Sequence, residues 1–294
     1  MEILYKNRSI TSCLKTAYNF YMSNLKGILH ALWLPVLLCG IFSAAFITLM
    51  ISQDNSSIPF LQRPHLYVIL VVVLCLASVI TGIWAFARLS SFLNEMPRRW
   101  NFKRMSVVVM ASLLVSLPIL IFLVGGIWLM FIYGNAGSNV LIKTIFLVGV
   151  SLLALFLVVP MIYVNMKYLH VKEVNYLKAF STNYRKAFRY VGFLFVTIIL
   201  TLLLAFVITS VILLPLYVLL IAKSKSNAGV AMGDPADIPG YFIWLVYAAM
   251  VFACIVLWLI IIYEMLVCSF LYGSIEQKQA EMQEAKEMVS ATNE

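Results

Sequence analysis

Residues 191–222 read VGFLFVTIILTLLLAFVITSVILLPLYVLLIA, a run in which no side chain carries a charge. A hydrocarbon layer about 30 Å thick needs roughly 20 apolar residues of helix to cross it. A helix rises 1.5 Å per residue, so this run would be about 48 Å long. It must therefore tilt, protrude or break. Pro215 removes one backbone hydrogen bond and is the expected break point.

Five further runs of the same kind occur along the chain, and each is long enough to cross a bilayer. A charged side chain occurs in only one of the six, at Glu264. The sequence predicts an all-α polytopic protein whose residues 1–294 form a single membrane domain. The expected transmembrane helices are at about 28–51, 66–87, 105–133, 144–166, 191–222 and 241–273.

Composition excludes an ordinary soluble globule. Hydrophobic residues make up 63% of the chain and charged residues 11%, whereas soluble domains carry about 25% charged residues. So few charges cannot coat a globule of this size in water. Core helices of soluble proteins also rarely stay apolar on every face for so long.

The net charge of +9 could indicate nucleic-acid binding, but its distribution favours another interpretation. The basic residues concentrate before the first run, between the second and third, between the fourth and fifth, and after the sixth. The positive-inside rule places these segments, and both termini, in the cytoplasm. We therefore expect no nucleic-acid partner, and an attraction to anionic lipids at the cytoplasmic face.

Short amphipathic segments accompany the long runs. Apolar residues recur at helical spacing through 9–25, which predicts an interfacial surface helix, with Ser9 as a plausible N-cap. Residues 172–189 carry a similar stripe before the fifth run. Residues 275–294 read as a charged, helical cytoplasmic tail.

Glu264 is the main candidate for a functional polar group within the membrane. A carboxylate inside a membrane helix is costly unless it is paired, protonated or hydrated. Arg88 and Lys167 would lie about one turn closer to the cytoplasm, so an ion pair of Glu264 with either is expected. Hydration without a partner and a proton or cation relay remain open. Asn165 would hydrogen-bond across a helix interface and complete this candidate polar cluster.

The returning helices of the three predicted hairpins share an isoleucine followed by an aromatic residue, at 83–84, 162–163 and 262–263. Arg88 and Lys167 follow the aromatic residue by four positions in the first two hairpins, whereas Val267 does so in the third. A threefold hairpin duplication and chance similarity among apolar helices both remain open as explanations of this pattern.

Signatures of common catalytic and cofactor sites are absent from the sequence: there is no Walker loop, HExxH or GxSxG. The three histidines are isolated, and the five cysteines show no CxxC spacing. We expect no catalytic residues, no cofactor and no metal site.

The layout resembles that of uncharacterised six-helix integral membrane proteins of Bacteroides-type bacteria. The features that carry this resemblance are the surface helix at 9–25, the Trp33-Leu34-Pro35 entry to the first run and the three basic-loop hairpins. The layout is also similar to the membrane domain of some glycerophosphodiester phosphodiesterases. Their catalytic barrel is absent here, so the resemblance implies a membrane fold and no activity.

These observations favour a non-catalytic integral membrane component with a scaffold, assembly or envelope-partner role. The expected location is a bacterial cytoplasmic membrane, crossed several times, with another membrane protein as partner. The alternative is a small-molecule or lipid transporter or permease, which the prolines and Glu264 favour. An intramembrane enzyme is the weakest hypothesis, because no pair of catalytic groups is apparent.

Overall fold

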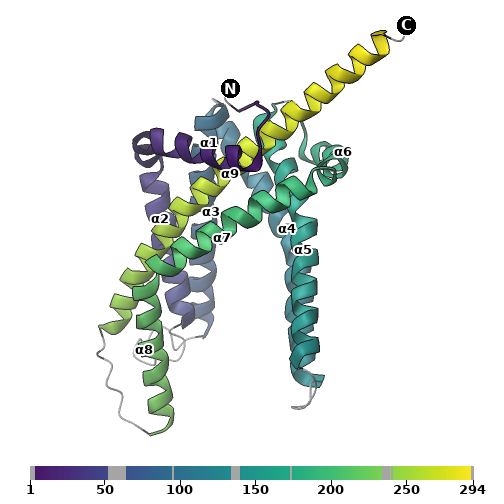
Figure 1. Cartoon of the computed structure of the whole chain (residues 1–294). Coiled ribbons are helices and arrows are strands. Elements are labelled where there is room, and N and C mark those ends of the chain that lie inside the picture. Colours follow the sequence, from purple (N-terminus) through teal and green to yellow (C-terminus); the bar gives the residue numbers. More distant parts are fainter. Residues whose placement is uncertain are drawn as a thin grey trace. The chain divides into compact units, whose positions relative to one another are not determined.

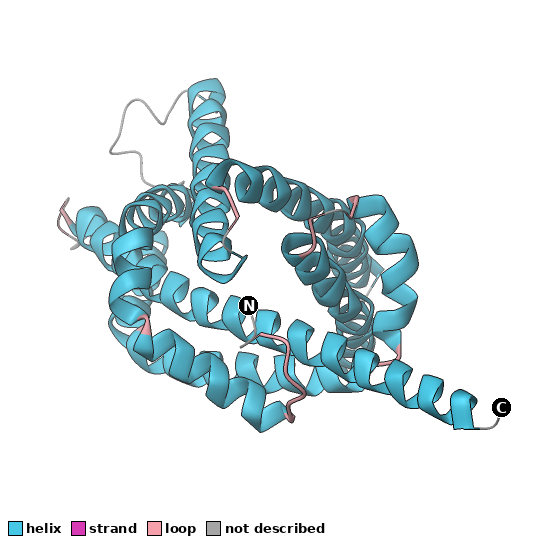
Figure 2. Ribbon diagram, turned by 90° about the horizontal axis from the view of Figure 1, so that it is seen from above, coloured by secondary structure: helices cyan, strands magenta, loops and turns pink. Residues whose placement is uncertain are grey.

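The computed structural model describes residues 4–51, 64–94, 96–133, 140–172, 174–233, 239 and 241–292. Every regular element among these residues is a helix (Figure 2). In chain order (Figure 1) they are α1 (Ile10–Ser23), α2 (Leu25–Ile51), α3 (Pro64–Asn94), α4 (Arg98–Tyr133), α5 (Val140–His170), α6 (Tyr176–Phe188), α7 (Val191–Ile212), α8 (Leu214–Ala231) and α9 (Phe242–Thr292).

Six of these helices, α2, α3, α4, α5, α7 and α9, are long and apolar enough to cross a membrane. They coincide with the six charge-free or nearly charge-free runs of the sequence. The chain therefore has the length and composition of a multi-pass membrane protein, as predicted.

The fifth run breaks near the expected proline. Helix α7 ends at Ile212 and α8 begins at Leu214, with Pro215 in its first turn. Proline is well tolerated there, because its missing N–H falls among those that have no intrahelical acceptor. Helix α8 then passes Ala222, the predicted end of the run, and ends at Ala231, just before Gly233 with its positive φ of 97°.

The last helix is longer than expected. The sequence predicts a transmembrane helix to residue 273 and a separate tail, whereas α9 continues unbroken for 51 residues to Thr292 (Figure 1). Gly273 is the only residue of poor helix propensity near the predicted boundary, and one glycine costs about 1 kcal/mol, too little to end a helix by itself.

The described residues group into two compact units. The first, here called the polar unit, lies within residues 1–19, 90–199 and 266–294. The second, the apolar unit, lies within residues 20–89 and 200–265. The names refer to the side chains that each unit buries.

The apolar unit packs through small side chains. Its core cluster joins Ala44 of α2, the first turn of α8 and α9, where Ala253 and Cys254 are buried. Gly40 of α2 is so close to α9 that an added Cβ would lie 3.0 Å from Ile255 Cγ1. Small residues allow helices in lipid to approach closely, and van der Waals contact then holds them together.

Helix α3 joins the apolar unit in the same manner. A Cβ on Gly82 would lie 3.3 Å from the ring of Trp258 on α9. Four residues earlier, the carbonyl of Ser78 accepts a hydrogen bond from the Cys39 thiol of α2 at 3.3 Å. The Ser78-xxx-Gly82 spacing thus lies at a helix contact.

Candidate functional site

The polar unit buries hydrogen-bonding groups, most of which lie outside the six apolar runs of the sequence. They come from the N-terminal segment, from the end of α3 and the start of α4, from α5 to α7, and from α9. The buried polar residues are Arg8, Ser90, Asn94, Asn101, Arg104, His170, Asn183, Thr197, Ser269 and Ser274. Buried polar groups of this kind are stable only when they find partners, so their contacts define the site.

Arg104, in the second turn of α4, caps the end of α5. Its guanidinium donates to the carbonyls of Tyr168, Val171, Lys172 and Val174. The same group lies between two aromatic rings, 4.1 Å from the centroid of Trp100 and 4.3 Å from that of Tyr168. The last carbonyls of a helix have no intrahelical partner and carry partial negative charge, so a cation there is favourable.

A pair of amides reinforces this cap. Asn94 and Asn101 are 1% and 0% exposed, and each donates to the other's side-chain oxygen, at 2.7 and 3.0 Å. Asn94 also donates to the carbonyl of Leu169 at 3.1 Å, and Asn101 donates to the hydroxyl of Ser91 at 2.9 Å. The end of α3, the start of α4 and the end of α5 are therefore locked by one set of hydrogen bonds.

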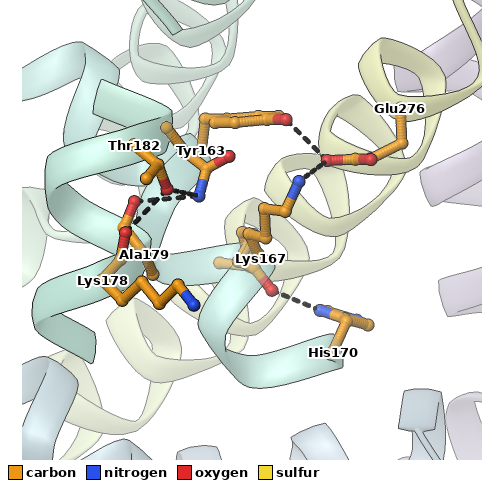
Figure 3. A network of polar contacts seen from close by, with 9 residues as sticks. Tyr163, Lys167, His170, Lys178, Ala179, Thr182 and Glu276 are labelled. Carbon is orange, nitrogen blue, oxygen red and sulfur yellow. Dashed lines mark hydrogen bonds and ion pairs between the residues drawn. The ribbon is translucent and has the colours of Figure 1, made fainter. Parts of the chain in front are cut away.

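The second cluster centres on Glu276 of α9 (Figure 3). Lys167 forms an ion pair with Glu276 Oε1 at 2.8 Å, and the hydroxyl of Tyr163 donates to the same oxygen at 2.5 Å. The charged side chains are 18% and 23% exposed. Solvent screens this mostly buried ion pair less than it screens a fully exposed one, so the attraction is stronger, and the hydrogen bond from the tyrosine partly offsets the desolvation.

Aromatic rings surround this cluster. Tyr272, one turn before Glu276, has its ring centroid 5.6 Å from that of Tyr163 and 6.2 Å from that of Tyr5. His170 stacks on Tyr272 at 5.5 Å with an interplanar angle of 29°. Its Nδ1 lies 2.9 Å from the carbonyl of Met166, and since a carbonyl only accepts, that nitrogen carries the proton.

The N-terminal segment completes the polar unit by lying across α9. Ser274 accepts a hydrogen bond from the backbone N–H of Arg8 at 3.0 Å and donates to its carbonyl at 3.2 Å. At Gly273 an added Cβ would overlap the carbonyl of Leu4. The glycine is therefore required by the close approach of two backbones. Further along, Asn7 donates to Glu281 at 2.7 Å.

Cys13 of α1 lies at this same crossing. Its side chain is fully buried and hydrogen-bonds with Ser274. Burial raises the pKa of the Cys13 thiol above its ordinary value, although the nearby charge of Arg8 opposes this shift. The thiol is therefore both inaccessible and largely protonated near neutral pH.

Two of the four residues predicted as a polar cluster lie in the polar unit. Lys167 pairs with Glu276, as described above. Asn165 accepts a hydrogen bond from the hydroxyl of Tyr176 on α6 at 3.0 Å and makes a long contact of 3.5 Å to Ser112 on α4. It thus links α5 to both neighbouring helices.

The other two predicted residues lie in the apolar unit. Arg88 donates to the carbonyl of Ala31 at 2.7 Å, and its guanidinium lies 5.2 Å from the Trp84 ring centroid. Glu264 is half-buried on α9. Among the described residues the structure gives Arg88 these contacts and no ion pair with Glu264, so the pairing expected from sequence is not formed at Arg88.

Sequence analysis missed Arg104, the asparagine pair, Tyr272 and Glu276. It counted Arg104 as an orientation charge and Glu276 as part of the tail. A usable signal was present, because aromatic and charged residues are spaced by four at Trp84–Arg88, Tyr163–Lys167 and Tyr272–Glu276. In the first two pairs the cation lies over the ring, at 5.2 and 5.8 Å.

The arrangement is suited to holding helices together. Its carbonyls are occupied by Arg104 and Asn94, and its carboxylate Glu276 is occupied by Lys167 and Tyr163. Among the described residues no group of three His, Cys, Asp or Glu side chains could hold a metal ion. No protein-family model, curated protein sequence or solved structure matches this chain.

Proposed function

We propose that this protein is a non-catalytic component of a bacterial cytoplasmic membrane, with both termini in the cytoplasm. It would act as a scaffold or assembly partner for other envelope proteins. The observation that carries this proposal is the polar unit, where the carbonyls at the end of α5 are held by Arg104 and Asn94. A polar unit held together by such contacts fixes the position of the segments attached to it.

The hydroxyl groups of the apolar runs support the same interpretation. Ser78, Thr81 and Thr197 donate to carbonyls of their own helices at 2.7 to 2.8 Å. Ser116 of α4 does the same at 3.1 Å. Hydroxyls used in this way are satisfied locally, whereas a route for a polar solute needs polar groups directed into a shared space.

The end of α9 is the segment that the polar unit would present to a partner protein. Residues 281–291 are exposed along their whole length. They include Glu281, Glu284 and Glu287 but only one basic residue, Lys286. An exposed acidic helical segment in a sequence with a net charge of +9 is suited to a partner with a basic surface, because opposite charges guide association.

Site-specific photo-crosslinking in native membranes tests this role. A photoreactive amino acid at Glu284 should give protein adducts, while one at Leu114 or Ile121 of α4, where the apolar side chains are 67% and 65% exposed, should give lipid adducts only. Exchanging Glu284 and Glu287 for lysine should abolish the protein adduct. Lipid adducts alone at Glu284 would refute the scaffold role.

A small-molecule or lipid permease is the second candidate. The interruption at Leu213 and the half-buried Glu264 favour it, since discontinuous helices and intramembrane carboxylates are common in transporters. Proteoliposomes holding a pH-sensitive dye would report solute-driven proton movement. Movement that Glu264→Gln abolishes would replace the scaffold proposal with this one, and its absence over a panel of polar solutes would refute the permease.

A further inference from the structure

Helix α6 is tied to two membrane-crossing helices. It follows α5, whose candidate span ends at His170, and precedes α7, whose span begins at Val191. The hydroxyl of Tyr184 on α6 donates to the carbonyl of Leu157 at 2.8 Å, and Leu157 lies within the candidate span of α5. The connections at both ends are short and this contact holds α6 against α5, so α6 stays beside the two candidate spans that it joins.

Its orientation about its own axis is also fixed. One face, formed by Tyr176, Ala179, Asn183 and Ala187, is buried. Tyr176 is anchored by its hydrogen bond to Asn165 and by its edge-on contact with the ring of Tyr168 at 5.2 Å. The remaining faces therefore have defined directions relative to α5.

Two stripes run along those remaining faces. Leu177, Tyr184 and Phe188 are spaced i, i+7 and i+11, so they share one side of the helix. Each is followed directly by a basic residue, which gives a second stripe about 100° further round. The second stripe consists of Lys178, Arg185 and Arg189, all exposed.

Leu177 is the residue of the first stripe that can meet hydrocarbon, because Tyr184 and Phe188 contact α5 or each other. The side chain of Leu177 is 76% exposed. Phe188 packs on Phe156 of α5 with ring centroids 5.8 Å apart and on Tyr184 at 5.2 Å. The cations of the second stripe form no hydrogen bond or ion pair through their side chains within the described residues. Residues 174–190 contain no acidic side chain.

We infer that α6 binds the headgroups of anionic phospholipids along the stripe of Lys178, Arg185 and Arg189, with Leu177 inserted at the edge of the hydrocarbon. An apolar stripe beside a basic stripe is the arrangement by which an interfacial helix meets an anionic membrane. The site depends on α6 lying at the bilayer surface and does not depend on the scaffold role.

The test compares lipid binding by the full-length protein in detergent. Dioleoyl phosphatidylglycerol and dioleoyl phosphatidylcholine are titrated separately, and native mass spectrometry counts bound lipids. Each basic residue near an anionic surface contributes about a fivefold change in affinity, so K178Q/R185Q/R189Q should weaken phosphatidylglycerol binding on the order of 100-fold. Phosphatidylcholine binding should not change.

A matched control removes the same charge elsewhere. The triple variant R98Q/R99Q/K103Q alters three exposed basic residues at the start of α4 and should keep most of the phosphatidylglycerol affinity. The variant K178R/R185K/R189K retains the charge and should bind like the wild type. Leu177→Gln should weaken binding of both lipids roughly tenfold, because it removes the apolar contact between this side chain and the lipid hydrocarbon.

Four results would overturn the inference. They are unchanged binding by K178Q/R185Q/R189Q, equal losses in the two glutamine triples, a lipid preference that survives about 1 M salt, where charges are screened beyond about 3 Å, and full competition by inorganic phosphate. Should the α6 triple fail to fold, R185Q alone and the salt titration of the wild type decide the matter.

Discussion

The two units of this protein bury different kinds of side chain, and different forces stabilise the inside of each unit. The apolar unit packs glycine, alanine and cysteine between helices, as at Gly40 against Ile255. The polar unit instead encloses a guanidinium, two amides and an ion pair, each with partners. The hydrophobic effect does not drive helices together in lipid. Close van der Waals packing therefore stabilises the apolar unit, whereas directional hydrogen bonds also stabilise the polar unit.

The comparison leads to a general expectation about mutations. Substitutions that remove a hydrogen-bonding group should affect the polar unit strongly and the apolar unit weakly. The experiments below test this expectation and the packing at the crossing of the N-terminal segment over α9, in order of the size of the expected effect.

Arg104→Gln should have the largest effect. It leaves the carbonyls of Tyr168, Val171 and Lys172 without their cation, and it removes the cation–π contacts of the guanidinium with the rings of Trp100 and Tyr168. We expect a loss of at least about 3 kcal/mol in unfolding free energy, or loss of folded protein. The measurements are the thermal unfolding midpoint in detergent and the monodisperse yield in gel filtration.

Lys103→Gln is the matched control, because Lys103 is adjacent in sequence and exposed. It should change the midpoint by no more than an exposed surface substitution does, about 0.5 kcal/mol. Equal effects at positions 103 and 104 would show that the cap on α5 contributes nothing specific.

Gly273→Ala should come next. The added methyl group overlaps the carbonyl of Leu4, so the N-terminal segment must move off α9. We expect a destabilisation of about 1–3 kcal/mol, the range for overpacking, despite the better helix propensity of alanine. Gly192→Ala is the control, since nothing lies within 4 Å of a Cβ there.

Cys13 reports the same displacement chemically. In a variant whose sole cysteine is Cys13, a maleimide reagent should react slowly at pH 7, because the thiol is buried and its pKa is raised. Labelling should accelerate as pH rises, since the thiolate is the reactive form. Gly273→Ala should speed labelling at every pH, and identical rates with and without it would contradict the close crossing.

The Lys167–Glu276 pair should show a moderate effect. In a double-mutant cycle with Lys167→Met and Glu276→Gln, we expect a coupling energy of about 1–2 kcal/mol, within the range for residues in direct contact. Lys172→Met with Glu276→Gln provides the control and should be additive. Additive losses for Lys167 and Glu276 would mean that the ion pair does not stabilise the fold.

Arg88 and Glu264 should give the smallest coupling. Arg88 contacts the Ala31 carbonyl and Trp84, so its removal should cost the same whether or not Glu264 is present. The same type of cycle should return a coupling within about 0.5 kcal/mol of zero. A coupling as large as that of Lys167 and Glu276 would restore the ion pair predicted from sequence and weaken the contrast between the units.

The helices themselves could be predicted from sequence because they depend on local properties. Runs without charge locate the six long helices, and proline chemistry locates the break near Pro215. Helical spacing of apolar residues locates α1 and α6. Each of these signals lies within about 30 consecutive residues, so no knowledge of packing is needed.

The polar contacts could not be predicted because they join distant residues. Lys167 and Glu276 are 109 positions apart, and the carbonyls that Arg104 binds lie 64 to 70 positions away. Asn94 and Asn101 are near in sequence, but Pro97 between them indicates a break in the helix and hides their pairing. The backbone carbonyls at the end of α5 cannot be recognised from the sequence, because every residue has one.

The crossing of the N-terminal segment over α9 has a consequence for biogenesis. Arg8 and Ser274 are 266 positions apart, so the segment that carries Arg8 is synthesised long before the part of α9 on which it rests. Until α9 is synthesised, the segment around Leu4 and Arg8 has no surface on which to settle. Docking of this segment is therefore among the late steps of folding, because both hydrogen bonds to Ser274 must wait for α9.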